Sequence, residues 1–305
     1  MSSLRPSVLF LLLTASAACS AGNAVGTTTT GTGGAGSGGE GGAGGASTTS
    51  TSTSTGEGVG GSFTTGVGGG GGGEPLIAEV WGQSPDTLYK LDPTSNAVTN
   101  IGKFKSCAGG VTDIALDKDS NLYGTATGSL FHIDKKTATC TLISMGSYPN
   151  SLSFVPAGTV DAAKEALVGY LGAQYIRIDT TNGKVTTIGQ LGGGYTSSGD
   201  VVSVKGKTYL TAKGPDCTSG DCLLEINPKT GDLVKNWGDV AYTKVFGLAF
   251  WAGKAYGFTD AGELFEINFA MNGITTKKIT IPGNLMLQFW GAGSTTSAPV
   301  DPVPQ

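Results

Sequence analysis

A five-residue phrase recurs five times at near-constant spacing, and this repeat constrains the fold more than any other feature of the chain. In each copy the second and fourth residues are large and apolar, the third is charged or His, and Asp or Asn ends the phrase. The copies are Leu88-Tyr-Lys-Leu-Asp92, Leu130-Phe-His-Ile-Asp134, Tyr175-Ile-Arg-Ile-Asp179, Leu223-Leu-Glu-Ile-Asn227 and Leu264-Phe-Glu-Ile-Asn268. Their first residues lie 42, 45, 48 and 41 positions apart. The alternation predicts a half-buried β-strand that stops at a turn, once in every structural unit.

Three more strands accompany each phrase. A turn follows it, in which the closing Asp or Asn side chain can accept hydrogen bonds from backbone amides two residues on. A further strand comes next, and two apolar segments before the phrase predict two more strands, such as those around residues 114–116 and 122–124. Four strands in a unit of about 44 residues match the spacing of a propeller blade.

The two ends of the repeat region predict how the ring closes. The first unit lacks its leading strand, because only a Gly/Ser/Thr-rich segment precedes Leu76. The last segment, Leu287-Gln-Phe-Trp-Gly291, is similar to Leu248-Ala-Phe-Trp-Ala252 but has no later strands. We therefore expect an all-β, five-bladed propeller with four-stranded blades over residues 75–294, in which a C-terminal strand closes the first blade. Residues 295–305 are then a disordered tail. An all-β sandwich of irregular units is the alternative.

The repeat resembles that of a large group of bacterial propeller proteins with the pattern G-x-L-Y…L-x-x-I-D…T-G…T-x-I-G. Here the pattern appears as Asn121-Leu-Tyr-Gly124, in the phrase at 130–134, and as Gly183-Lys-Val-Thr-Thr-Ile-Gly189. The resemblance covers nearly all of residues 76–291. Lipid-anchored members with a similar N-terminal segment resemble uncharacterised exported proteins of myxobacteria. The resemblance implies a propeller fold and no particular activity.

The N-terminus has the layout of a secretory signal. Arg5 gives a short positive region, residues 8–13 form an apolar stretch too short to span a bilayer, and small residues follow. Ser16-Ala-Ala-Cys19 resembles a lipobox, in which the cysteine thiol is acylated and becomes the first residue after cleavage, although Ser16 stands where Leu is usual. We expect a signal peptide over residues 1–18 and lipidation at Cys19. Ordinary signal-peptidase cleavage near the same alanines is the alternative.

The segment after Cys19 predicts a tether. Up to residue 74 it consists almost entirely of Gly, Thr, Ser and Ala, with three glutamates as its only charges. It has too little apolar surface to offset the entropy lost on ordering, so residues 19–74 are expected to be disordered. The chain is thus expected to be exported and anchored by its lipid alone to the bacterial outer membrane or cell surface, as a monomer.

Four cysteines remain once Cys19 is set aside. An even number of cysteines in an exported protein is consistent with disulfide pairing. Cys217 and Cys222 flank Thr-Ser-Gly-Asp, a turn-forming stretch that brings them together. Pairing of Cys107 with Cys140 then follows only by elimination.

Little in the sequence points to catalysis or to nucleic acid. The net charge is −4, and no Lys/Arg cluster is present to neutralise a phosphate backbone. The one histidine, His132, occupies the polar position of its phrase, which excludes a multi-histidine metal site. Small or neutral residues are expected to face the channel: Ala115, Ser153, Ser203, Ala249 and Gln288. We expect a non-enzymatic protein with no metal or cofactor. The alternative is a hydrolase or lyase of the lactonase type with a metal in the central channel.

One face of the propeller gathers candidate binding residues. They stand in the connections to the innermost strands and at the starts of those strands: Tyr148, Tyr195, Tyr242, Asp113, Asn150 and Asp200. Tyrosines make rigid contact surfaces with a polar tip, although packing between blades is the other interpretation. The oxygen-bearing side chains could hold Ca²⁺, or bond the local backbone instead. We expect this face to bind an envelope glycan, peptide or protein.

Overall fold

The repeated phrase forms the third strand of every blade. In all five copies the first, second and fourth residues are buried and the third is half-buried, as the alternation predicts. His132 is one of these half-buried third residues. The third strands are β2 (Thr87–Asp92), β6 (Ser129–Asp134), β10 (Gln174–Ile178), β14 (Cys222–Ile226) and β18 (Leu264–Ala270). In the first four blades the closing Asp or Asn accepts a hydrogen bond from the amide two residues on, at 2.8–2.9 Å.

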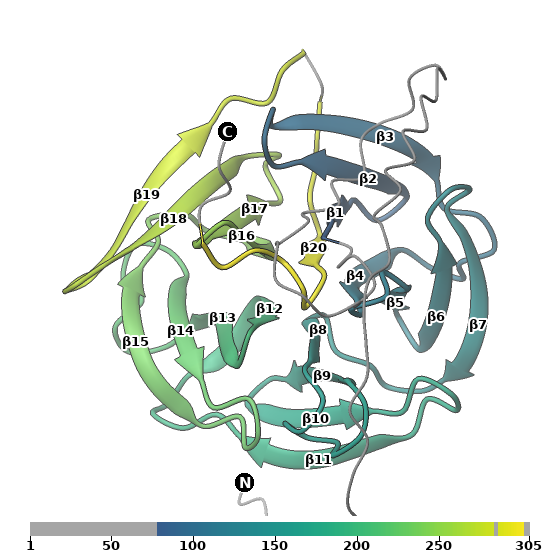
Figure 1. Ribbon diagram of the computed structural model, residues 1–305, viewed down its shortest axis with the longest axis horizontal. Helices are drawn as coiled ribbons and strands as arrows, with labels where there is room; N and C mark the ends of the chain where they lie inside the picture. Colours follow the sequence, from purple (N-terminus) through teal and green to yellow (C-terminus); the bar gives the residue numbers. More distant parts are fainter. Residues whose placement is uncertain (1–77, 284–285, 302–305) are drawn as a thin grey trace, which may run out of the picture. The chain divides into compact units, whose positions relative to one another are not determined.

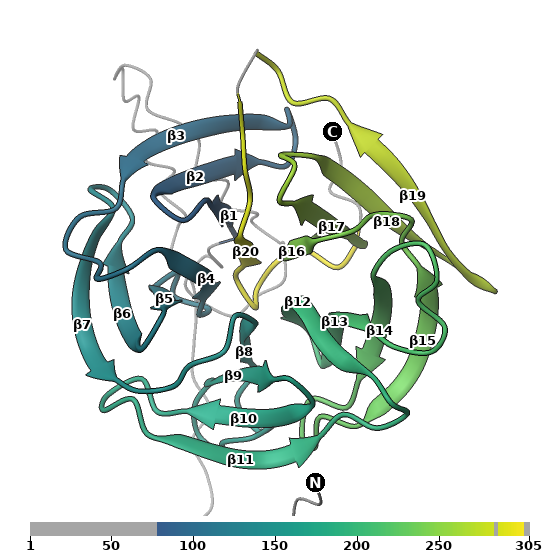
Figure 2. The ribbon, with the colours of Figure 1, turned by 180° about the vertical axis from the view of Figure 1, so that it is seen from behind.

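The computed structural model describes residues 78–283 and 286–301, and in this part of the chain five four-stranded antiparallel sheets surround a central axis (Figures 1 and 2). This confirms the five-bladed propeller. The predicted signal peptide, Cys19 and the predicted tether lie outside the described residues. Within the described ranges no helix is long and apolar enough to cross a membrane.

The remaining strands complete the blades from the axis outwards. The innermost strands are β20 (Gly291–Ser294), β4 (Val111–Leu116), β8 (Leu152–Val155), β12 (Thr196–Val204) and β16 (Val245–Trp251) of blades 1 to 5. The second strands are β1 (Val80–Gln83), β5 (Leu122–Ala126), β9 (Ala166–Leu171), β13 (Lys207–Lys213) and β17 (Lys254–Thr259). The outer strands are β3 (Ala97–Lys103), β7 (Thr139–Met145), β11 (Val185–Gln190), β15 (Leu233–Asp239) and β19 (Gly273–Ile279).

Antiparallel order gives the ring two different faces. The turn face carries the connections from first to second and from third to fourth strands, many of them short turns such as residues 93–96, 205–206 and 252–253. The loop face carries the second-to-third connections and the links between blades, such as residues 146–151 and 214–221. All the candidate binding residues lie on or below the loop face.

A C-terminal strand closes the ring, as predicted, but it is not the predicted segment. Strand β20 pairs antiparallel with β1, and Val80 lies opposite Ser294. Phe289 is buried edge-on against the rings of Tyr89 and Phe258 instead of joining the strand. The reason is space near the axis, because a Cβ on Gly291 would lie 2.2 Å from a carboxylate oxygen of Asp113. Only the small residues that follow Trp290 fit there.

The segment after β20 is not a disordered tail over residues 295–301. Thr295, Thr296 and Ala298 are buried. The amide of Thr295 donates to the carbonyl of Glu79 in blade 1, and the amide of Ala252 in blade 5 donates to the carbonyl of Pro299. In Figure 1 this yellow segment runs from β20 across the centre towards β16. The expected tail therefore packs on the propeller as far as Asp301, and residues 302–305 lie outside the described part.

Both expected disulfides are present. Cys217 and Cys222 close the β13–β14 connection, with Cα atoms 5.3 Å apart. Cys107 and Cys140, which lie 33 residues apart, join the link between blades 1 and 2 to strand β7. Two disulfides are consistent with an oxidising, extracytoplasmic environment.

Candidate functional site

The six candidate residues do not form one surface. Asp113 and Asp200 are completely buried at the centre of the ring. Tyr195 is buried and Tyr242 half-buried in packing contacts. Only Tyr148 and Asn150 line a hollow on the loop face. The candidates therefore separate into an axial pair, two packing tyrosines and one surface site.

The axial pair, Asp113 and Asp200, joins all five blades. Asp113 accepts hydrogen bonds from the amides of Ile114 and Leu152, at 2.8 and 2.6 Å. Asp200 accepts from Val201 and Leu248, at 2.6 and 2.7 Å, and from Ala292. These five amides belong to the innermost strands of blades 2, 3, 4, 5 and 1, one from each. The axial pair thus accepts hydrogen bonds from amides at the centre of the ring, where an innermost strand has no further neighbour.

The pKa values of both carboxyls of the axial pair are raised. Burial and the adjacent charge of Asp200 hold the pKa of Asp113 well above its usual range. Burial likewise raises the pKa of Asp200, and hydrogen bonds from the Leu248 amide and from Asp113 partly oppose this rise. Two carboxylates that touch in a low dielectric cannot both ionise without strong repulsion. We therefore infer that the two carboxyls of the pair hold one proton between them.

The residues at the axis do not fit a calcium ion. Five N–H groups point at the four carboxylate oxygens, and such dipoles favour negative charge over a cation. Asn150 does not join the pair, because it is exposed on the loop face. The described residues contain no group of three or more His, Cys, Asp or Glu side chains that could hold a metal. We assign the two aspartates a structural role.

The innermost strands elsewhere carry small buried residues, which agrees in part with the expected channel. Ala115, Ser153, Ser203 and Ala249 are all buried. The hydroxyl of Ser153 accepts a hydrogen bond from the amide of Ser203 at 3.0 Å, and this bond joins blades 3 and 4. Gln288, by contrast, is exposed, and its side-chain amide donates a hydrogen bond to Asp260. It does not face the axis, because the innermost strand β20 starts only at Gly291.

Tyr195 and Tyr242 stabilise the fold. The Tyr195 hydroxyl donates to Asp216 at 2.5 Å and accepts from Asn236 at 3.0 Å, which ties the β13–β14 connection to the outer strand of blade 4. Tyr242 stacks on Phe265, with ring centroids 3.9 Å apart and an interplanar angle of 7°. Both contacts support the packing interpretation of these tyrosines.

A hollow of about 450 Å³, the loop-face hollow, lies between blades 2 and 3. Tyr148 and Asn150 line it together with Thr112, Thr127, Ser147 and Gly172. The Tyr148 hydroxyl donates to the carbonyl of Gly183 at 2.9 Å, which fixes its ring. Asn150 is exposed, and its side chain makes no hydrogen bond to the described residues. This lining of amide, hydroxyl and backbone groups suits a polar ligand.

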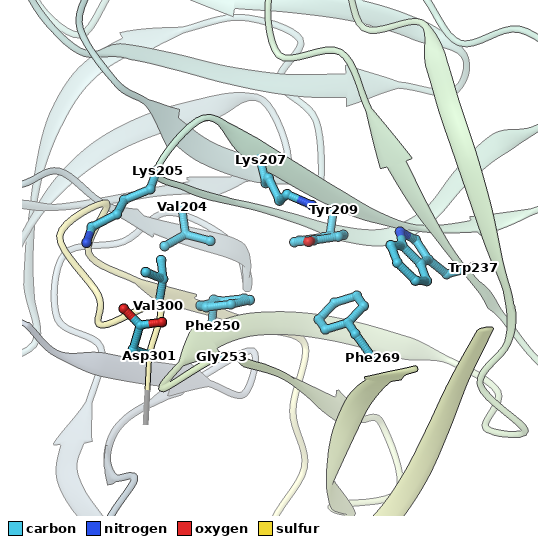
Figure 3. A pocket seen from close by; sticks show the side chains of 10 residues that line it. All are labelled: Val204, Lys205, Lys207, Tyr209, Trp237, Phe250, Gly253, Phe269, Val300 and Asp301. Carbon is cyan, nitrogen blue, oxygen red and sulfur yellow. The ribbon is translucent and has the colours of Figure 1, made fainter. Parts of the chain in front are cut away.

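A second hollow, which the sequence analysis did not identify, lies on the turn face between blades 4 and 5 (Figure 3). We call it the aromatic cleft, and it encloses about 380 Å³. The rings of four residues surround one end: Tyr209, Trp237, Phe250 and Phe269. Lys205 and Asp301 lie at the other end. Asp301 belongs to the segment expected to be disordered, which is one reason that the cleft was missed.

Comparisons with known proteins bear on the fold alone. No family model and no curated protein matches the chain. Hydrazine synthase of Kuenenia stuttgartiensis is similar at 13% identity, over 68% of this chain and 63% of its own, with a TM-score of 0.38. This chain thus spans less than two thirds of that one. A chain of the nidogen/laminin complex is similar at 9% identity, over 72% of this chain and 85% of its own, with a TM-score of 0.42. The β-propeller domain of Myceliophteria thermophila Cps50 (Swd1) is similar at 10% identity, over 68% of this chain and 70% of its own, with a TM-score of 0.40.

Proposed function

We propose that this chain is an exported lipoprotein whose propeller is a non-enzymatic binding module for an envelope glycan, peptide or protein. The observation that carries the proposal is the loop-face hollow with Asn150 at its surface. Strands of a propeller are committed to pairing and packing, so ligand contacts fall to its loops. Asn150 offers two donors and one acceptor that the described residues leave unused.

The chemistry of the hollow supports a polar partner. Its volume of about 450 Å³ lies in the range of ligand pockets. Sugar hydroxyls and peptide amides both donate and accept hydrogen bonds, as the side chain of Asn150 does. Tyr148 gives the hollow a rigid wall, because its hydroxyl is held by Gly183.

The loop-face site is tested by Asn150→Ala in the full chain. Purified peptidoglycan, envelope polysaccharide and envelope protein fractions are each titrated against the immobilised protein. We expect one fraction to bind, and Asn150→Ala to weaken that binding by about 1–3 kcal/mol, because the amide is a direct contact. Gln288→Ala, an exposed change outside the hollow, is the control. Equal binding by both variants would contradict the site.

The anchor is tested by Cys19→Ala. A thioether-linked lipid is the only stable membrane attachment that we propose, and such chains hold a protein at a bilayer. We expect the variant to move from the membrane fraction to the soluble extracytoplasmic fraction, as judged by fractionation and immunoblotting. Cys19→Ala that stays in the membrane fraction to the same extent as the unmodified sequence would rule out this anchor.

A further inference from the structure

The aromatic cleft arises where the repeat departs from its own pattern. In blades 1 to 4 the outer strand has a β-bulge opposite the first two residues of the phrase, so that one residue of the outer strand has no partner at this point. That residue is Ile101, Ile143 and Ile188 in the first three blades. In blade 4 it is Trp237. Isoleucine at this position is sufficient for a blade, so the larger ring of Trp237 is not required by the fold.

A second departure lies directly opposite, in blade 5. The residue after the closing Asp or Asn is Pro93, Lys135, Thr180 and Pro228 in blades 1 to 4, where a turn begins. In blade 5 strand β18 continues to Ala270 and places Phe269 there. The rings of Trp237 and Phe269 meet with centroids 5.0 Å apart at an angle of 73°. Two independent changes in the repeat therefore converge on one cleft.

The corresponding place between blades 1 and 2 shows how the fold closes such a space. There Lys135, the counterpart of Phe269, donates to Glu79 at 2.6 Å and lies over the ring of Trp81. Burial alone raises the pKa of Glu79, but hydrogen bonds from Lys135, Ser120 and Lys90 lower it to about 2. An ion-pair cluster fills that site, whereas the aromatic cleft stays open.

Charged side chains of both signs border the cleft. Lys207 pairs with Glu225 at 3.6 Å, and Lys235 lies 3.3 Å from the ring centroid of Trp237. Lys205 is exposed and forms no ion pair with the described residues. It also has a φ of 40°, a left-handed conformation that Asn or Gly adopts more readily than Lys. Ala252, the equivalent turn residue of blade 5, has a similar φ of 51°, so this left-handed turn does not itself require lysine.

We propose that the aromatic cleft binds a hexopyranose unit of a glycan. A pyranose has an apolar C–H face, which packs on aromatic rings such as Trp237 and Phe269. Its edge carries hydroxyls, which both donate and accept hydrogen bonds. The ammonium groups of Lys205 and Lys207 supply donors, and the carboxylate of Asp301 supplies an acceptor. This complementarity, apolar walls beside a rim of both charges, favours a sugar over an aromatic peptide side chain, which would leave the rim unused. The site is on the turn face and does not depend on the loop-face proposal.

The test uses the full chain and calorimetric titration with defined oligosaccharides: hexamers of glucose, N-acetylglucosamine, mannose and galacturonic acid. We expect at least one to bind with a Kd below about 1 mM. Trp237→Ile restores the residue of the other blades, so the variant should keep its melting temperature and lose affinity at least about tenfold, or 1.4 kcal/mol. Gln288→Ala, an exposed change that lies outside the lining of the aromatic cleft, should bind these sugars as the unchanged protein does.

Lys205→Asn gives a second measurement that does not depend on the Trp237 variant folding. Asn suits the left-handed turn, so the variant should be at least as stable and should still bind more weakly. The proposal is overturned if none of the four hexamers binds with a Kd below about 1 mM. It is also overturned if both variants bind as well as the unchanged protein, or if N-acetyltryptophanamide binds the cleft and the sugars do not.

Discussion

A chain that ends after Trp290 is expected to lose cooperative folding altogether. It lacks β20, so β1 is left with an unpaired edge at the centre of the ring. It also loses the bond from the Phe250 amide to the Ser294 hydroxyl, at 3.0 Å, and the amide of Ala292 that bonds Asp200. At about 1 kcal/mol for each lost hydrogen bond, the sum approaches the 5–15 kcal/mol that stabilises a typical domain.

The matched control ends after Asp301 and keeps every described contact of the closing segment. We expect it to unfold in urea with the same midpoint as the full chain, while the chain ending after Trp290 shows no transition or aggregates. Intermediate truncation after Ser294 should fall between them, because it keeps β20 but removes the contacts of Thr295 and Pro299 with Glu79 and Ala252. Identical midpoints for all three would refute closure by β20.

Stability is expected to fall as pH rises, because of the axial pair. The unfolded carboxyls titrate near their usual pKa of about 3.9. In the folded protein burial, and then the charge of Asp200, holds the pKa of Asp113 well above that value. A proton held more tightly in the folded state stabilises it fully below the unfolded pKa, and this contribution is lost as pH rises through the folded pKa. Urea midpoints between pH 4.5 and 9 should therefore decline towards alkaline pH.

Asp113→Asn isolates this contribution. An asparagine amide can donate to Asp200 but accepts only one of the two amides that Asp113 accepts, so we expect a loss of about 1–3 kcal/mol at pH 5. The variant has no proton to lose, so its stability should change less with pH and the difference from the unchanged protein should shrink on the alkaline side. The raised pKa of Glu165, which burial causes, acts equally on both proteins. Parallel pH profiles would exclude the shared proton.

The strands and their order followed from the sequence because they depend on local patterns. Alternation in the phrase at 130–134 requires only that one side of a strand is buried, and the turn after Asp134 requires only nearby amides. The Cys217–Cys222 pair is likewise a short-range feature. The number of blades followed from counting copies, and the missing first strand implied closure from the C-terminus.

The same patterns did not reveal which C-terminal residues form the strand that pairs with β1 and closes the ring. Leu287-Gln-Phe-Trp-Gly291 resembles a first strand, yet the central position is decided by how closely β20 approaches Asp113 of blade 2 and Gln83 of its own blade. Phe289 is large enough to fill the space between blades 1 and 5, so it packs there and the strand begins at Gly291. Steric fit among segments more than a hundred residues apart has no local signature.

The sequence by itself determined the five four-stranded blades, the half-buried place of His132 and which cysteines could pair. Tertiary structure alone decided that Asp113 and Asp200, 87 positions apart, meet at the axis and that Trp237 and Phe269 open a cleft. The physical reason is that burial alternates along a strand and is visible in neighbouring residues. Contact between two side chains, by contrast, depends on the distance between blades, which is set by the packing of the whole ring.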